Sequence, residues 1–238
     1  MDKIEKKLWK KVNKYVPLLK HIPFLRYVAI CNNLSFSKVN ENSDIDIFII
    51  TKSNRIFFVR TLVTLIFHIL GVRRHGKHTK NRFCLSFFID ENSLDLSKLA
   101  IKDDIYLALW IYHQKVIIDD GVSTQFIKEN KWVERYIDNF NPLNDEYKIN
   151  HNSLFSSLLT FLLDNKIGDF IEHLLSKWQI KRAKSKASSL SDLTGTIITN
   201  NILKFHNNDR RHEYKKLWYD KYTTGKKVNL KEFKKLLP

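Results

Sequence analysis

The sequence predicts an α/β fold in which a small mixed sheet is followed by a helical C-terminal part. Three short runs of β-branched and apolar residues, at 27–31, 44–51 and 83–89, are typical of strands. A long apolar helix pattern at 54–70 lies between the second and third runs, which indicates a helical crossover within one sheet. From residue 126 onward, helical patterns replace strand patterns.

The first elements follow from local patterns. Residues 2–19 form an amphipathic helix pattern, with apolar residues at helical spacing between lysines, and Pro17 and Pro23 limit its end. A polar, turn-rich segment at 32–42 separates the first strand from the second. The second strand, 44–51, is almost continuously apolar, so we expect it to be central and covered on both faces.

The middle of the chain alternates apolar and basic segments. The helix at 54–70 is apolar nearly all round, so we expect it to pack against the sheet, and Gly71 is suited to end it. Residues 72–82 follow as a basic loop or short strand with five Lys or Arg and no acid. After the third strand, Asp103 and Asp104 precede an apolar helix that runs to Tyr112, so capping is their expected role.

The second half is predicted to be helical. Helical patterns cover 126–140 and 153–184, with a linker at 141–150, and the longer pattern is interrupted near Gly168.

Length and composition favour two domains. The chain has 238 residues, of which 43% are hydrophobic, and this suits one or two globular units with apolar cores. We therefore predict an α/β domain at 1–124 and a helical, basic domain at 125–238, either as an all-helical domain or as an extension packed on the first.

The net charge favours an anionic partner. A formal charge of +16 suits binding to nucleic acid, nucleotide phosphates or an anionic membrane surface. The alternative explanation is a genome whose proteins are basic in general, because its codons favour Lys and Asn. Trp218, Tyr219 and Tyr222 lie among C-terminal lysines and are candidates for stacking on RNA, although aromatics at helical spacing more often pack in a core.

Two cysteines and the absence of a leader pattern favour a cytoplasmic protein. Cys31 and Cys84 lack metal-ligand spacing, so buried thiols in a reducing compartment are expected. No signal peptide is visible, and the longest apolar stretch, 56–70, is too short to span a bilayer. We expect no stable membrane insertion, and no pattern indicates the oligomeric state.

The most informative feature is a pair of carboxylates at the start of the second strand. Asp44 and Asp46 are one residue apart, so they point to the same face and repel each other unless a cation lies between them. Hard oxygen ligands of this kind suit Mg²⁺ or Mn²⁺ with the phosphates of a nucleoside triphosphate. An exposed strand end with solvated acids is the alternative.

The segments Ile30–Phe36 and Asn42–Ile49 resemble the nucleotidyltransferase superfamily of DNA polymerase beta, in which a Gly-Ser turn precedes Asp-x-Asp at the start of the next strand. The resemblance covers roughly residues 20–120. It implies a metal-dependent transfer of a nucleoside monophosphate from the triphosphate to a hydroxyl acceptor on nucleic acid, protein or a small molecule. In the family, the Asp pair holds two Mg²⁺ ions and pyrophosphate leaves.

Two departures accompany the resemblance. Asn32 and Asn33 stand at the Gly-Ser position, where an Asn tolerates the backbone and its amide can donate to phosphate. The third carboxylate of the family is missing from the strand at 83–89, where we expect Ser86 opposite the site, and Asp90 lies about 13 Å along the strand. The alternative function is therefore a catalytically impaired protein that binds nucleotide or nucleic acid through its basic surface.

The remaining candidate phosphate contacts are Ser43, beside the Asp pair, and Lys77 and Arg82 in the basic loop. A solvated loop is the alternative for the last two. His75 and His78 have no partner at metal spacing, so zinc is not expected.

Overall fold

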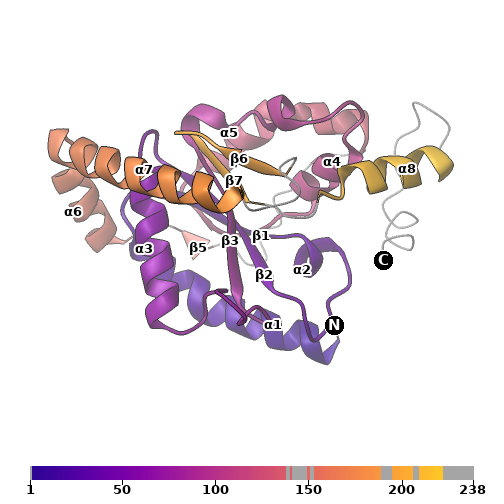
Figure 1. Cartoon of the computed structure of the whole chain (residues 1–238), viewed down its shortest axis with the longest axis horizontal. Helices are drawn as coiled ribbons and strands as arrows, with labels where there is room; N and C mark the ends of the chain where they lie inside the picture. The colour runs from indigo at the N-terminus through magenta and orange to yellow at the C-terminus, as the bar shows by residue number, and fades with distance from the viewer. Residues whose placement is uncertain are drawn as a thin grey trace.

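One seven-stranded mixed sheet runs through the computed structural model, in the order β5-β4-β1-β2-β3-β7-β6 (Figure 1). The structure describes residues 2–137, 140, 149–150, 153–188, 195–205 and 209–221. The predicted α/β class and mixed sheet are confirmed, and the C-terminal part is mainly helical as expected.

The elements have the following bounds. The strands are β1 (Leu25–Cys31), β2 (Ile45–Thr51), β3 (Phe83–Asp90), β4 (Lys115–Asp119), β5 (Ile149–Asn150), β6 (Thr196–Ile198) and β7 (Ile202–Phe205). The helices are α1 (Lys3–Tyr15), α2 (Asn33–Phe36), α3 (Ile56–Ile69), α4 (Ile105–Tyr112), α5 (Val122–Glu129), α6 (Leu154–Leu163), α7 (Lys166–Ala187) and α8 (Arg211–Lys221).

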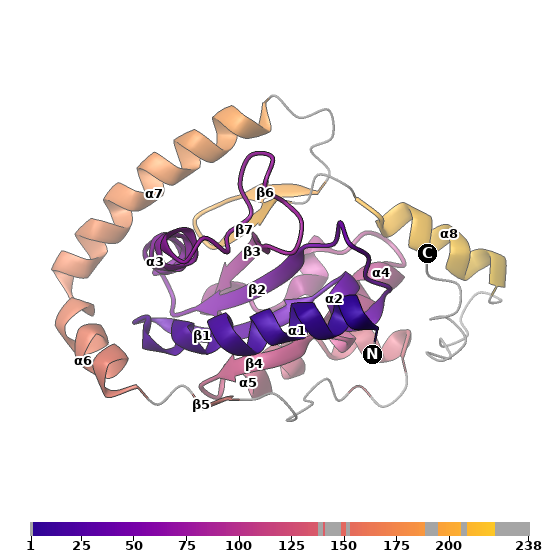
Figure 2. The same cartoon turned by 90° about the horizontal axis from the view of Figure 1, so that it is seen from below.

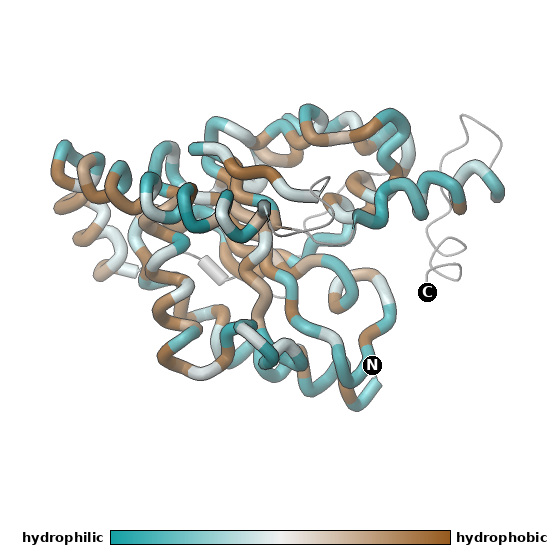
Figure 3. The backbone as a smooth tube through the Cα atoms, in the orientation of Figure 1, coloured by the Kyte–Doolittle hydropathy of each residue, from teal (hydrophilic) through white to brown (hydrophobic). Residues whose placement is uncertain are grey.

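Strand β2 is central, as its apolar sequence predicts. It pairs antiparallel with β1 and parallel with β3, and α3 makes the crossover between the two parallel strands. Its side chains alternate between two cores, with Ile47 and Ile49 on one face of the sheet and Phe48 and Ile50 on the other. Figure 3, in which the backbone is coloured by residue hydropathy, shows hydrophobic residues along the strands at the centre of the molecule.

Helices cover both faces of the sheet. One core includes apolar residues of α1 and α3, and the other includes residues of α4, α5 and α8. Figure 2 shows α1 across the sheet, with α3 beside it and α7 outside α3. None of the described helices combines the length and the apolar character that are needed to span a bilayer.

The C-terminal part is not all-helical. Strands β6 and β7 form a hairpin that pairs with the free edge of β3, and β5 pairs with β4, so strands from both sides of residue 124 join one sheet. These strands are two to four residues long, too short to give a strand pattern in the sequence. Strand β4 and the single-turn helix α2 were also not predicted.

Buried or capping asparagines set two helix ends that differ from prediction. Helix α5 stops at Glu129 instead of continuing to 140, because the buried Asn130 side chain bonds the backbone of Leu94, Leu96 and Phe126. The long C-terminal helix breaks before Gly168, because Asn165 caps α7. Most of the predicted linker at 141–150 lies outside the described residues.

Candidate functional site

The structure brings Asp44 and Asp46 together at the start of β2. Asp46 is paired with Cys31 on β1 and with Cys84 on β3, so the three side chains form a row on the face of the sheet that α4 covers. One carboxylate oxygen each of Asp44 and Asp46 and the Cys84 sulfur lie within 4.8 Å of one another. This is a compact group of two hard oxygen donors and one soft sulfur donor.

The environment of Asp46 disfavours its charge. Burial raises the pKa of Asp46 to about 6, and the neighbouring Asp44 carboxylate adds to this effect. Hydrogen bonds from Asn32 and Cys84 and the charge of Arg74 offset part of the shift. Two carboxylates at this spacing therefore carry an electrostatic cost that a bound cation would remove.

Arg74 is the cation that the structure places beside the pair. Its Nη1 donates to Asp44 Oδ2 at 2.5 Å and to the Cys84 sulfur at 3.6 Å. The sequence grouped Arg74 with the basic loop but did not single it out. Its contact depends on the path of the loop, which folds back through a bridge between Arg73 and Phe83.

Cys84, and not Ser86, is the β3 residue in register with Asp46. The register shifts by one residue between the pairs Asp46–Cys84 and Phe48–Phe87, so an extra β3 residue lies opposite Ile47. The expectation that Ser86 lies opposite the site is therefore wrong, although Ser86 hydrogen-bonds the Cys84 thiol. Burial, with the charges of Asp46 and Asp44, raises the pKa of Cys84, so the thiol is protonated at neutral pH.

Asp90 has a structural role at the other end of β3. It is fully buried beside Thr51, and its carboxylate accepts from the backbone N–H of Asn54 at 3.0 Å and of Asn92 at 3.1 Å and from Asn201 Nδ2 at 2.8 Å. Among the described residues, no third carboxylate joins Asp44 and Asp46.

Asn32 connects the acidic pair to α4. Its backbone has φ 52° and ψ −137°, a positive-φ conformation outside the αL region that favours glycine. Its Oδ1 accepts from the Tyr106 hydroxyl at 3.1 Å, and its amide hydrogen-bonds Asp46. Asn33 is the next residue and the first of α2, half-buried at the same turn.

The other predicted phosphate contacts have structural partners or lie apart. The buried Ser43 hydroxyl accepts from Asn40 N at 2.9 Å, so it holds the turn before Asp44. Arg82 Nη1 donates to the carbonyls of Gly71 at 2.6 Å and Arg73 at 3.3 Å, which pins the basic loop. Lys77 lies at the exposed loop tip between the bridged pair His75 and His78.

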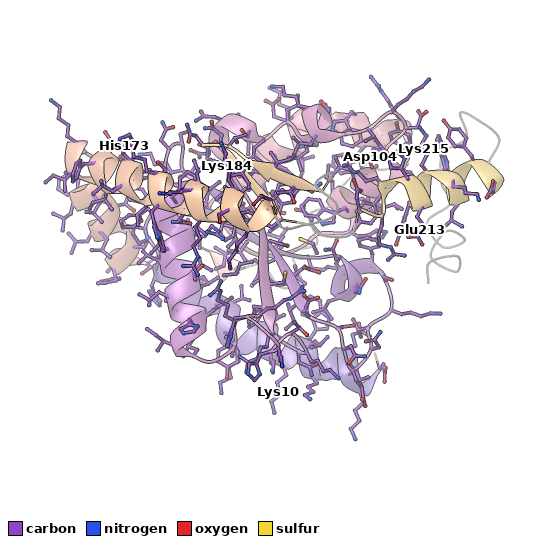
Figure 4. All side chains as sticks on the ribbon, viewed as in Figure 1. Lys10, Asp104, His173, Lys184, Glu213 and Lys215 are labelled. Carbon is purple, nitrogen blue, oxygen red and sulfur yellow. The ribbon has the colours of Figure 1, made fainter. Side chains whose placement is uncertain are left out.

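Helix α8 extends the surroundings of the site. Tyr106 on α4 packs against Tyr214 at a centroid distance of 4.8 Å, and the guanidinium of Arg210 lies 5.0 Å over the Tyr214 ring. Figure 4 labels Asp104 together with Glu213 and Lys215 of α8. Arg211 Nη1 of α8 lies 4.0 Å from Asp104 Oδ2, and Lys215 Nζ donates to the Lys102 carbonyl at 2.8 Å. Asp104 caps α4 as predicted, by accepting from Leu107 N.

The proposed RNA-stacking aromatics do not form an open platform. Trp218 is only 4% exposed and packs in the core beside Tyr136. Tyr219 is half-exposed, and its hydroxyl donates to Asp103 at 2.6 Å. Tyr222 lies outside the described residues. Packing explains the aromatic spacing of α8 better than stacking on bases.

The sequence singled out Asp44, Asp46 and Asn32 as candidates, and the fold places Arg74, Cys84 and Tyr106 beside them. No family model matches this chain, and no curated protein matches it either.

Proposed function

We propose that this chain is a metal-dependent nucleotidyltransferase that moves a nucleoside monophosphate from a nucleoside triphosphate to a hydroxyl acceptor. The observation that carries the proposal is the pair of carboxylates, Asp44 and Asp46, gathered at the start of a central strand. The raised pKa of Asp46 supports it, because paired carboxylates with no cation between them are costly. The glycine-like backbone of Asn32 agrees with the Gly-Ser turn that the family resemblance implies.

The donor set suits a hard divalent cation at two of its three positions. Asp44 and Asp46 would hold Mg²⁺ or Mn²⁺, which typically take one or two protein carboxylates and complete their shell with phosphate and water. The Cys84 thiol is a soft donor and is protonated, so it would be a neighbour of the Mg²⁺ shell and not a member.

The surrounding residues have roles in orientation and charge. A bound divalent cation would neutralise triphosphate charge and lower the pKa of an acceptor hydroxyl. Asn32, held by Tyr106, fixes the position of Asp46 through its amide. A cation on Asp44 would compete with Arg74, whose guanidinium would then be free to pair with a phosphate oxygen.

A second candidate function is the binding of nucleotide or another polyanion without turnover. Cys84 stands beside Asp46 where the family resemblance implies a third carboxylate, and this favours weaker metal binding. The positive charge of the chain is compatible with RNA as the polyanion.

A transfer assay tests the proposal. The protein is incubated with labelled nucleoside triphosphates, Mg²⁺ or Mn²⁺, and either pooled RNA or cell extract. We expect label transfer that Asp44→Asn and Asp46→Asn abolish and that Glu41→Gln, at an exposed acid three residues away, leaves unchanged. Transfer that persists in both Asp variants would contradict the assigned site. Nucleotide binding without transfer under either metal would favour the second function.

A further inference from the structure

Helices α6 and α7 present a large apolar surface to solvent. Nine side chains, each between 51% and 92% exposed, form what we call the outer apolar face: Leu154, Phe155, Leu158, Phe161 and Leu162 on α6, and Ile167, Phe170, Leu174 and Trp178 on α7. They recur at helical spacing, so each helix exposes one continuous stripe. Figure 2 shows both helices at the outside of the molecule, with α3 between α7 and the sheet.

Polar contacts fix the orientation of α7, so the apolar stripe is not a freely rotating surface. The buried Glu172 carboxylate accepts from Phe57 N at 2.9 Å and Phe58 N at 2.7 Å, at the start of α3. The buried Gln179 amide donates to the Phe57 carbonyl at 2.9 Å. Rotating α7 to hide its apolar stripe would break these bonds and leave buried polar groups without partners.

A second set of contacts holds the turn between the two helices. Arg55, which is 4% exposed, pairs with Asp169 at 2.7 Å, and Lys52 pairs with Asp164. The inner side of this unit is therefore docked through these polar contacts and through Leu163, Leu175 and Ile180, which pack against the core. Its outer side is apolar and uncovered by any described segment.

The outer apolar face exposes a large summed apolar area on two adjoining helices. Nine large side chains that are half or more exposed amount to an area on the order of 1,000 Å² over the two stripes together, so each stripe alone is comparable to the largest patch of a typical monomer, a few hundred Å². Exposed apolar surfaces of this size usually mark a site where a protein binds a partner or a membrane.

The charges beside the face point to an anionic partner. Beyond Glu172, α7 carries Lys177, Lys181, Arg182, Lys184 and Lys186 and no acid. Lys177 and Lys181 are exposed on the same side of the helix as Phe170 and Leu174, and the Arg182 guanidinium lies 5.7 Å from the Trp178 ring. Figure 4 labels Lys184 on the same helix. A second copy of this chain would bring like charges together, whereas anionic lipid headgroups complement them.

We propose that α6 and α7 bind the surface of an anionic lipid bilayer. The outer apolar face would enter the boundary between headgroups and acyl chains, and the lysines of α7 would contact lipid phosphates. Trp178 and the exposed phenylalanines suit that boundary. Helix α6, with ten residues, is too short to cross the bilayer. This surface binding is independent of the proposed transferase activity.

Vesicle sedimentation of the full chain tests the proposal. The probes are vesicles of phosphatidylcholine mixed with phosphatidylglycerol, and vesicles of phosphatidylcholine alone. We expect the protein to sediment with the anionic vesicles only, and less so at high salt. The double variant Phe161→Asp and Phe170→Asp should abolish binding. The matched control Ile69→Asp, at a residue 73% exposed near the far end of α3, should retain it.

The lysines provide a second readout. Each of Lys177→Gln and Lys181→Gln should weaken vesicle binding roughly fivefold, because a basic residue near an anionic surface contributes about 1 kcal/mol. Absence of binding to anionic vesicles, or binding that the double Phe variant does not reduce, would overturn the proposal. Sedimentation velocity that shows a dimer dissolved by the same double variant would also overturn it, in favour of a second copy as the occupant.

Discussion

Replacing the carboxylate of Asp46 by an amide should make the protein more stable at neutral and alkaline pH. The pKa of Asp46 is 3.8 in the unfolded reference and about 6 in the folded protein. Because the folded-state pKa is raised, the folded state favours the protonated form. The stability that protonated Asp46 contributes to the folded state is fully present below pH 3.8, and it is lost as the pH rises through 6 and the carboxylate ionises.

The magnitude follows from the two pKa values. At 1.36 kcal/mol per pKa unit, the interval from 3.8 to about 6 corresponds to about 3 kcal/mol of destabilisation by the ionised carboxylate. Asp46→Asn keeps the side-chain shape and an acceptor oxygen but carries no charge. We therefore expect its free energy of unfolding to exceed that of the wild type by up to about 3 kcal/mol at pH 8, and by much less near pH 4.

Urea denaturation followed by tryptophan fluorescence at both pH values measures this difference. Glu41→Gln, at an exposed acid, should show no comparable gain. A lower stability of Asp46→Asn at pH 8, or a difference that does not change with pH, would refute the electrostatic reasoning. Mn²⁺ at one hundred times its dissociation constant should stabilise the wild type by about 2.7 kcal/mol and leave the variant unchanged.

Three further changes test the site and the docking of α7. Cys84→Asp supplies a third carboxylate beside Asp46, so it should tighten Mn²⁺ binding at least tenfold in a calorimetric titration, and weaker binding would contradict the assigned geometry. Glu172→Ala leaves two helix N–H groups unpaired and should lower the free energy of unfolding by about 2 kcal/mol in urea, whereas no loss would argue against its capping role. Asn32→Gly removes a Cβ at φ 52° and gives up the side-chain bonds to Tyr106 and Asp46, so the free energy of unfolding should rise by at most about 1 kcal/mol. A fall in the melting temperature of Asn32→Gly would show that these two bonds outweigh the backbone strain.

The central part of the fold could be predicted because its signals are local. An almost unbroken apolar run marks β2, and a long apolar helix between two strand runs marks the crossover α3. The acidic pair is also local, since side chains two residues apart on a strand share a face. Position along one strand was therefore enough to place Asp44 beside Asp46.

The remaining features depend on pairing between distant segments. The bulge in β3 places Cys84, and not Ser86, opposite Asp46. The alternation of side chains along that strand does not predict the bulge. The single buried Asn130 ends α5 through bonds to a loop more than thirty residues earlier in the chain. Strands β6 and β7 are too short for a period-two pattern, and they are strands because the edge of β3 needs partners.

Helix α7 shows the limit of periodicity most clearly. Its apolar stripe is well defined in sequence, and the usual rule would turn that stripe toward the core. The structure instead buries Glu172 and Gln179 and exposes Phe170 and Leu174. The first N–H groups of α3 and the carbonyl of Phe57 supply partners for these buried polar groups. The sequence of α7 alone cannot predict these partners, because they belong to another helix.

The bond between Glu172 and the start of α3 has a consequence for biosynthesis. The carboxylate lies 115 residues beyond Phe57, and the hairpin that covers the edge of β3 follows later still. A nascent chain that has just released β3 from the ribosome therefore has an uncapped helix and an open strand edge, both of which attract wrong partners. Completion of the fold has to wait for the last third of the polypeptide, so ribosome-bound or prematurely terminated chains should be clients for chaperones or proteases.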